Sequence, residues 1–387
     1  MKIARFDGFI RTDGHVGVRN NVALIPSVIC ANGVVEQIKQ RVPECKAFFH
    51  KEGCDQLKDD ARLTMRTLIG AGSNPNIAAA LVIGLGCEEI RSDELAEEIA
   101  ASGRPVKSLD IQDYGTSKAI SIGTRLARKL VKAASHIRRK PADPSSIVLG
   151  VECGASDWTS GLASNPVLGI ASDILVDNGG TVVMSETTEF IGAEHIFARR
   201  AANAAARRDF LQLISRAEKE LKRSGFDIRG TQPTPGNIQG GITTLEEKSL
   251  GAYLKGGRRK FEGVLTYSEK PRTNGLFVMD SPGFDVESIT GMVAGGAQLV
   301  AFTTGRGSPV GSAVSPVIKI TANKQTYRRM RENIDFYAGD VINGDRSIET
   351  TGEELFQQIL QVASGKITTA EKFGFSEFSI YRLRSSI

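Results

Sequence analysis

The segment 150–169 reads GVECGASDWTSGLASNPVLG, and it decides how the rest of the chain is interpreted. It combines a carboxylate (Glu152), a thiol (Cys153), Ser156 and Asp157 with glycines, between an apolar run at 147–149 and a helix-like stretch that follows. Polar groups this dense between a strand and a helix are typical of α/β binding sites, because loops at the carboxyl ends of parallel strands meet in one crevice. The structural alternative is a glycine-rich turn with a buried cysteine and a capping aspartate.

Strand-like and helix-like segments alternate on both sides of this stretch, which predicts an α/β fold with two Rossmann-like domains and mainly parallel, helix-covered sheets. In the first half, the expected strands are 21–27, 47–50, 79–86 and 106–111, and the expected helices are 32–40, 57–70, 92–101 and 115–137. The second half restarts at 147–151. Its further expected strands are 181–185, 276–280, 298–303 and 317–321, and its longest expected helix is 189–223.

The polar stretch 138–146, which contains two prolines, is the expected linker between the domains. It divides the chain into an N-terminal α/β domain at 1–140 and a C-terminal Rossmann-like domain at 146–387. The segment 225–257 is rich in glycine, proline and threonine, and its length indicates a functional, irregular loop.

Composition narrows the class of protein. The chain has 387 residues, of which 41% are hydrophobic and 6% aromatic, and its net charge is +5. Its basic runs alternate with apolar residues at helical spacing, so we expect no nucleic-acid partner, and the surplus charge suits a small anionic substrate. No long apolar run predicts a signal or membrane segment, and five cysteines in a long chain indicate a reducing cytoplasm. We also expect a homo-oligomer.

Thiols and carboxylates gather where the predicted strands end. Cys30 follows the first strand, His50 and Cys54 the second, Cys87 the third, and Glu152–Cys153 the first strand of the second half. His50, Cys54, Cys87 and Cys153 are a candidate set of ligands for iron or zinc. Three cysteines could also hold an iron–sulfur cluster with one open iron, although the spacing lacks the usual clustered pattern. The alternatives are core filling for each thiol and a hydrogen-bonded strand-end histidine.

Three further segments are candidates for anion binding. Thr243 and Thr244 can cap a helix that follows the glycine-rich loop beginning at Pro235, and its backbone amides could hold a carboxylate. Arg306 follows a predicted strand in the segment 303–311, and Arg19 lies just before one. Each of these loops could equally be an ordinary tight turn.

Taken together, the motifs resemble the altronate/galactarate dehydratase family of sugar-acid hydro-lyases. The resemblance runs in order along nearly the whole chain. It rests on GFIRTDGHVGVRN (8–20), HKEGCDQLKDD (50–60), VIGLGCE (82–88), the opening segment, SETTEFIGAEH (185–195), PGNIQGGITTLEEKSLG (235–251), MDSPG (279–283), FTTGRGSPVGSAVSPVIKI (302–320) and IDFYAGD (334–340).

The resemblance implies elimination of water from a 2,3-dihydroxy sugar acid with the help of a divalent metal, iron(II) first and manganese or zinc as alternatives. A sister branch releases sulfite from sulfolactate. Many members carry a small extra N-terminal domain; this chain starts at the first motif, so we expect a separate small subunit to supply it. A non-catalytic subunit or a nucleotide-binding module is the remaining alternative.

The resemblance also suggests roles for individual residues. The expected catalytic residues are Glu189, His195 and Asp157. The expected metal ligands come from His50, Cys54, Cys87 and Cys153. The expected substrate-binding residues are Arg19, Ser156, Asn237, Thr243, Thr244, Arg306 and Lys319.

Overall fold

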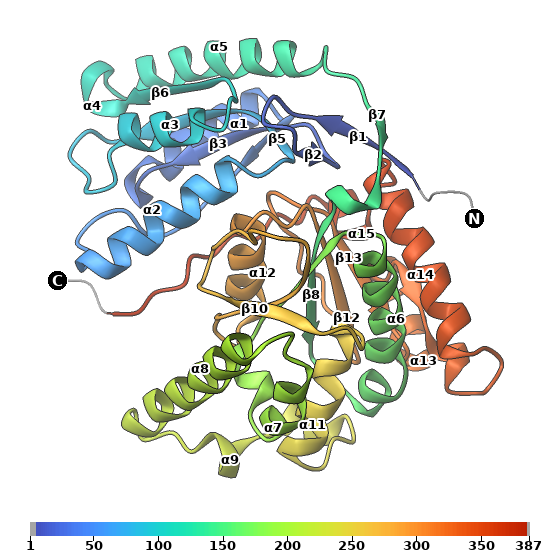
Figure 1. Cartoon of the computed structure of the whole chain (residues 1–387). Coiled ribbons are helices and arrows are strands. Elements are labelled where there is room, and N and C mark those ends of the chain that lie inside the picture. Colours follow the sequence, from blue (N-terminus) through green and yellow to red (C-terminus); the bar gives the residue numbers. More distant parts are fainter. Residues whose placement is uncertain (1–4, 385–387) are drawn as a thin grey trace.

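Two parallel β-sheets, each covered by helices, and a small antiparallel sheet make up residues 5–384, which are the part of the chain that the computed structural model describes (Figure 1). The first sheet has the order β4-β3-β5-β6, and its central strand β5 is buried along its whole length. Burial of both faces explains why this strand reads as an unbroken apolar run. The strands are β3 (Asn21–Pro26), β4 (Cys45–Ala47), β5 (Ile77–Gly84) and β6 (Val106–Asp110).

Helices on both faces of this sheet complete the N-terminal domain. One face packs against α1 (Asn32–Arg41) and α5 (Thr116–Ala134), and the other against α2 (Lys58–Gly72) and α3 (Ser92–Ala100). The short helix α4 (Ile111–Tyr114) follows β6 directly.

The second sheet has seven parallel strands in the order β10-β11-β9-β8-β12-β13-β14, with β8 in the middle. Helices α6 (Asn165–Asp177) and α14 (Ile348–Ala363) cover one face, and α12 (Asp285–Ala294) covers the other. The strands are β8 (Val148–Gly154), β9 (Thr181–Met184), β10 (Phe261–Leu265), β11 (Gly275–Met279), β12 (Leu299–Thr304), β13 (Val317–Thr321) and β14 (Phe336–Tyr337).

The two domains share a buried interface in which α12 packs against α2 (Figure 1). Two asparagines at the end of α2 satisfy backbone groups of the other domain: Asn74 donates to the carbonyls of Val293 and Ala297, and Asn76 donates to that of Gln298. Such paired buried amides fix the register of the interface, because an unpaired one would be costly.

The prediction of mainly parallel, helix-covered sheets is confirmed, and the differences lie in the connections. The expected linker contains β7 (Lys140–Ala142), which pairs antiparallel with β1 (Phe6–Ile10) beside β2 (Val16–Gly17). Hydrogen bonding to the N-terminal strand therefore orders a stretch whose prolines predicted a loop.

The single long helix expected at 189–223 is wrong. The chain forms short turns, including α7 (Glu194–Phe197), and only then α8 (Ala204–Arg223). Gly192 with a φ of +100° interrupts the helix, and the Asn203 side chain caps α8 by accepting from Ala206 N at 2.9 Å.

The expected irregular loop at 225–257 instead holds short helices. These are α9 (Ile228–Thr231), α10 (Pro235–Gln239), α11 (Leu245–Tyr253) and a 3₁₀ turn at Leu254–Gly256. The remaining short helices are α13 (Lys324–Arg329) and α15 (Thr369–Phe373). Within residues 5–384, no helix has the length and apolarity needed to cross a membrane.

Candidate active site

The carboxyl end of the central strand β8 carries two functional side chains that point in opposite directions. Glu152 and Cys153 are both buried, and consecutive strand residues face opposite sides of a sheet. The Glu152 carboxylate accepts hydrogen bonds from the hydroxyls of Ser185, at 2.9 Å, and Ser288. Cys153 instead lies against Glu189, with its sulfur 3.1 Å from Oε1. One strand end therefore contributes to two adjoining clusters.

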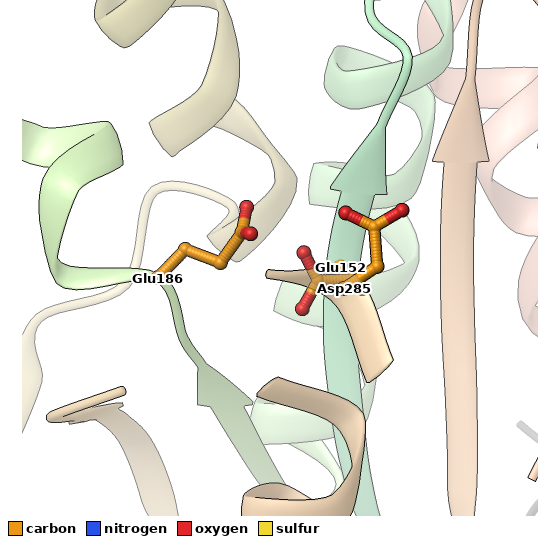
Figure 2. A group of neighbouring side chains, drawn as sticks. All are labelled: Glu152, Glu186 and Asp285. Carbon is orange, nitrogen blue, oxygen red and sulfur yellow. The ribbon is translucent and has the colours of Figure 1, made fainter. Parts of the chain in front are cut away.

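The first cluster is a triad of carboxylates formed by Glu152, Glu186 and Asp285. Figure 2 shows that Glu186 comes from the loop after β9 and Asp285 from the first turn of α12, and that the side chains extend into a common space beside β8. One carboxylate oxygen from each lies within 4.8 Å of the others. A β-carbon at Gly154 would stand 2.4 Å from Oδ2 of Asp285, so this close approach requires glycine.

Glu186 is held in an uncommon backbone conformation. Its φ is +61°, in the left-handed region that side chains other than glycine rarely adopt, and its amide donates to Ser281 Oγ at 2.7 Å. Its carboxylate has no hydrogen-bond partner among the described residues. Strain that aims a buried, unpaired carboxylate at two others is typical of functional sites.

Burial and mutual repulsion shift the acidity of this triad. Burial, opposed by Lys255, raises the pKa of Glu152 to about 7. Burial together with the charge of Glu152 raises the pKa of Glu186 well above its usual value, and the pKa of Asp285 is raised mainly by burial. A bound cation would remove this cost, because it compensates the buried negative charge.

The donor set fits a divalent metal ion. Glu152, Glu186 and Asp285 offer only carboxylate oxygens, which suit magnesium, manganese and iron(II) better than the softer, thiolate-favouring metals. These three residues would hold the ion, with hydroxyl groups of Ser185 and Ser288 fixing the Glu152 ligand.

The second cluster joins Cys153, Glu189 and Lys255, and it is almost sealed from solvent. The Lys255 ammonium pairs with Oε2 of Glu189 and lies 3.2 Å from the Cys153 sulfur, with the lysine and glutamate side chains 1% and 8% exposed. Burial raises the pKa of Cys153 to about 12, which keeps the thiol neutral. Burial alone would raise the pKa of Glu189, but Lys255 holds it below its usual value.

Lys255 also serves the neighbouring triad. Burial lowers its pKa, but Cys153, Glu189, Glu152 and Glu186 outweigh burial and raise the pKa well above the usual value. The lysine is therefore protonated in the resting protein and acts as a cation on both clusters. Sequence reasoning missed Lys255 and Asp285; the lysine lies in a basic segment and the aspartate at a helix start, where charged residues are ordinary.

Other residues expected from the opening segment hold its backbone. Asp157 accepts from the amide and hydroxyl of Thr159 and from the Asn323 amide group, at 2.6–2.9 Å. The Asn237 side chain donates to the carbonyl of Ser156 at 3.0 Å. These bonds connect the loop after β8 to α10 and α13. The hydrogen bonds of Asp157 resemble those of a capping aspartate, which was the structural alternative for this segment.

Several expected substrate residues lie in structural contacts. Arg19 pairs with Glu371 at 2.7 Å and donates to three backbone carbonyls, while Thr243 and Thr244 bond the first turn of α11. Arg306 donates to the carbonyl of Gly236. Lys319 is buried, which lowers its pKa to about 8, and it donates to the carbonyl of Val310.

The four expected metal ligands are not brought together. Cys153 lies on the seven-stranded sheet, whereas Cys54 and Cys87 are exposed on loops of the four-stranded sheet. The ring of His50 is buried, with Nε2 2.8 Å from the Pro26 carbonyl and Nδ1 accepting from the Glu52 amide. Burial lowers its pKa to about 4. His195 is exposed on α7.

Comparison with known proteins assigns both domains. Residues 144–386 match the family model "D-galactarate/Altronate dehydratase, C-terminal", and residues 8–135 match "D-galactarate dehydratase/Altronate hydrolase, second domain". The chain is 38% identical to a (2R)-sulfolactate sulfo-lyase subunit beta from Chromohalobacter salexigens, covering 100% of this chain and 99% of that protein.

Longer relatives match over most of their length. Altronate dehydratase of Bacillus subtilis is 35% identical over 97% of this chain and 77% of its own. Galactarate dehydratase (L-threo-forming) of Escherichia coli is 33% identical over 94% and 73%. The relatives are lyases, and this chain is an enzyme of that class. Both domains of this chain therefore belong to the galactarate/altronate dehydratase family.

Proposed function

We propose that this chain is the catalytic subunit of a metal-dependent lyase that acts on 2-hydroxy acids and converts them to 2-oxo acids. The observation that carries the proposal is the carboxylate triad Glu152, Glu186 and Asp285, which adjoins a buried lysine. Abstraction of a proton next to a carboxylate generates an enolate. A site for this reaction needs compensation of negative charge, a base and an acid.

The reaction begins at C2 of the substrate. A base removes the C2 proton, the electron pair forms a C2–C3 double bond, and the C3 substituent leaves with its own bonding pair. The resulting enol then takes up a proton at C3 and becomes the 2-oxo acid. A divalent ion on the triad would bind the carboxylate and 2-hydroxyl oxygens and stabilise the enolate.

Glu189 and Lys255 are suited to opposite proton transfers. Glu189 is ionised, because Lys255 holds its pKa down, and we assign it the role of base. Lys255 carries a proton and can donate it to a leaving hydroxyl. Cys153 contacts both and positions them through its neutral thiol. Asp157 shapes the adjoining loop, and we assign no proton transfer to the exposed His195.

A sugar acid of the altronate or galactarate type is the first candidate substrate, because three of the family relatives are named for such acids. Departure of hydroxide requires protonation, which suits a cationic lysine at the site. Iron(II) or manganese fits the oxygen ligands, and the cytoplasm is the expected compartment.

Sulfolactate is the second candidate, favoured by the match to nearly the full length of a sulfo-lyase subunit beta. Sulfite leaves with its bonding pair and needs no proton. A subunit of that name has a partner, and a small subunit is the expected partner of this chain too.

The test is turnover of the chain, purified anaerobically alone and with any small subunit that copurifies with it, in the presence of iron(II) or manganese. A panel of aldonates, aldarates and sulfolactate is assayed for 2-oxo acid and for sulfite. We expect oxo acid without sulfite; oxo acid with sulfite selects the second candidate, and no oxo acid from any of these substrates refutes the proposal.

Two variants test the site itself. Glu186→Gln removes a triad charge and is expected to lower kcat/KM at least about 100-fold, on the order of 2.7 kcal/mol. Glu246→Gln, an exposed glutamate in the first turn of α11, is the matched control and should retain activity. Equal activities of the two variants would contradict the assignment of the triad.

A further inference from the structure

Three free thiols follow neighbouring strands of the N-terminal domain, and none of them belongs to the carboxylate triad. Cys30 follows β3, Cys54 follows β4 and Cys87 follows β5, and all three are exposed. The three strands are adjacent and parallel, so their carboxyl ends share one edge of the sheet. The thiols are thus far apart in sequence but come from neighbouring loops.

Direct contacts join the three loops at the residues next to each cysteine. The amide of Ile29 donates to the carbonyl of Glu52 at 3.0 Å, which joins the first loop to the second. The amide of Glu89 donates to the carbonyl of Gly53 at 3.2 Å, which joins the second loop to the third. Ser27 donates to the carboxylate of Glu88 at 2.6 Å, which joins the first loop to the third.

Gly53 makes this packing possible. Its φ is +112°, and a β-carbon there would lie 2.2 Å from the carbonyl oxygen of Ser27. The loop that carries Cys54 can therefore approach the loop that carries Cys30 only with glycine at this position.

The charges of two of the thiols act on the third. Burial and Asp55 are the largest causes that raise the pKa of Cys54, and the charges of Cys87 and Cys30 raise it further. Gln112 donates to the Cys87 sulfur at 3.5 Å, a contact of the kind that tunes metal-bound thiolates.

The distances between the three sulfurs indicate which kind of metal site they could form. Among the described residues, three ligand atoms come within 4.8 Å of one another only in the carboxylate triad, so at least one pair of the three sulfurs is more than 4.8 Å apart. Zinc, with bonds to sulfur of about 2.3 Å, needs its ligands closer. His50 is no fourth ligand, since both ring nitrogens are hydrogen-bonded. Cysteines that bind different irons of one cluster stand further apart.

We propose that Cys30, Cys54 and Cys87 bind a four-iron iron–sulfur cluster whose fourth iron has no protein ligand. Exposure of all three cysteines leaves that iron open to solvent and to small oxygen donors. The site shares no residue with the carboxylate triad, and it stands whether or not the proposed reaction is correct.

Acid-labile sulfide is the discriminating measurement, because iron on carboxylates carries none. The chain with its copurifying partner, purified anaerobically, is expected to contain about four sulfides per chain. Removal of one electron by ferricyanide should release the open iron as Fe²⁺ and leave a three-iron cluster with an electron paramagnetic resonance signal. Absence of sulfide after anaerobic reconstitution with iron and sulfide, bound zinc in its place, or a disulfide between two of the cysteines would overturn the proposal.

Variants assign the ligands. Cys30→Ala, Cys54→Ala and Cys87→Ala should each lower bound sulfide at least about tenfold, while thermal unfolding of the cluster-free variants should differ little from that of the cluster-free wild type, since exposed side chains contribute little to stability. Cys45→Ala removes a buried thiol of the same domain and is the control that should keep its sulfide. Sulfide retained in any of the first three variants, or lost equally in the control, contradicts the assigned ligand set.

Discussion

Replacement of Lys255 by methionine tests the buried ion pair that links the two clusters. The side chains of Lys255 and Glu189 are 1% and 8% exposed, so removal of the ammonium leaves a carboxylate inside the protein without its partner. Removal of one member of such a pair costs about 3–5 kcal/mol. Methionine retains most of the lysine's apolar volume, so little of this cost comes from packing.

Urea unfolding measures the cost. The chain has one tryptophan, Trp158, in the loop after β8, so its fluorescence reports on the domain that carries the pair. A second substitution, Glu189→Gln, removes the stranded charge. We therefore expect the double variant to be more stable than Lys255→Met alone, with a coupling energy of about 2 kcal/mol or more. A single-variant cost below about 1 kcal/mol would refute the buried pair.

The pH dependence of that cost has a definite sign. In the wild type, Lys255 lowers the folded-state pKa of Glu189, which contributes stability above the unfolded pKa of about 4.3 that is lost as the pH falls through the folded value. Without Lys255, burial raises the pKa, and the variant loses stability as the pH rises through the raised value. The difference between the two proteins should therefore shrink from about pH 8 to about pH 5. A difference that grows on acidification would contradict this.

Four further predictions follow from the contacts. Asp285→Asn should weaken manganese binding at least about tenfold in calorimetry, because one of three carboxylate ligands loses its charge. Manganese affinity of the wild type should fall by up to about 100-fold per pH unit below about 7, where the metal must displace protons from both Glu152 and Glu186. Arg19→Met should lower the free energy of unfolding by about 2–3 kcal/mol with KM unchanged, since Arg19 binds Glu371 and carbonyls; a raised KM at unchanged stability would restore a substrate role. Gly53→Ala should lower both thermal stability and bound sulfide, whereas sulfide at the wild-type level would show that the loop contact is dispensable.

The strand ends could be located from the sequence because a strand that is buried on both faces of its sheet consists of consecutive apolar residues. Glu152 and Cys153 were placed at such an end, and the structure has them at the end of β8. The set of metal ligands failed to assemble for a geometric reason. Strand ends share a rim only within one sheet, and the sequence pattern does not tell which strands pair; Cys54 and Cys153 lie on different sheets.

The residues next to a charged side chain in the sequence do not show whether that side chain is buried. Lys255 stands among exposed basic residues, and its neighbours Arg258 and Arg259 are of the same charge, yet only the lysine turns inward. The left-handed backbone conformation of Glu186 could not be predicted from the sequence either, because the residues after β9 suit an ordinary turn. Both residues take their roles from tertiary contacts, which single-sequence patterns do not encode.

The charge balance explains why the two clusters adjoin. Three buried carboxylates, those of Glu152, Glu186 and Glu189, and the partly buried Asp285 act on or pair with the buried Lys255 and Lys319, so negative groups outnumber positive ones, and an anionic substrate would add to the excess. Without a cation, burial together with this excess raises the pKa of Glu152 to about 7 and that of Glu186 well above its usual value, so protons relieve part of the excess. A divalent ion would release those protons and leave Glu189, already ionised by Lys255, as the one carboxylate of the four that is not a proposed metal ligand. Lys255 keeps Glu189 ionised before the ion binds, so the strength of the base does not depend on metal binding. The charged groups that the reaction needs are therefore already present in the apoprotein.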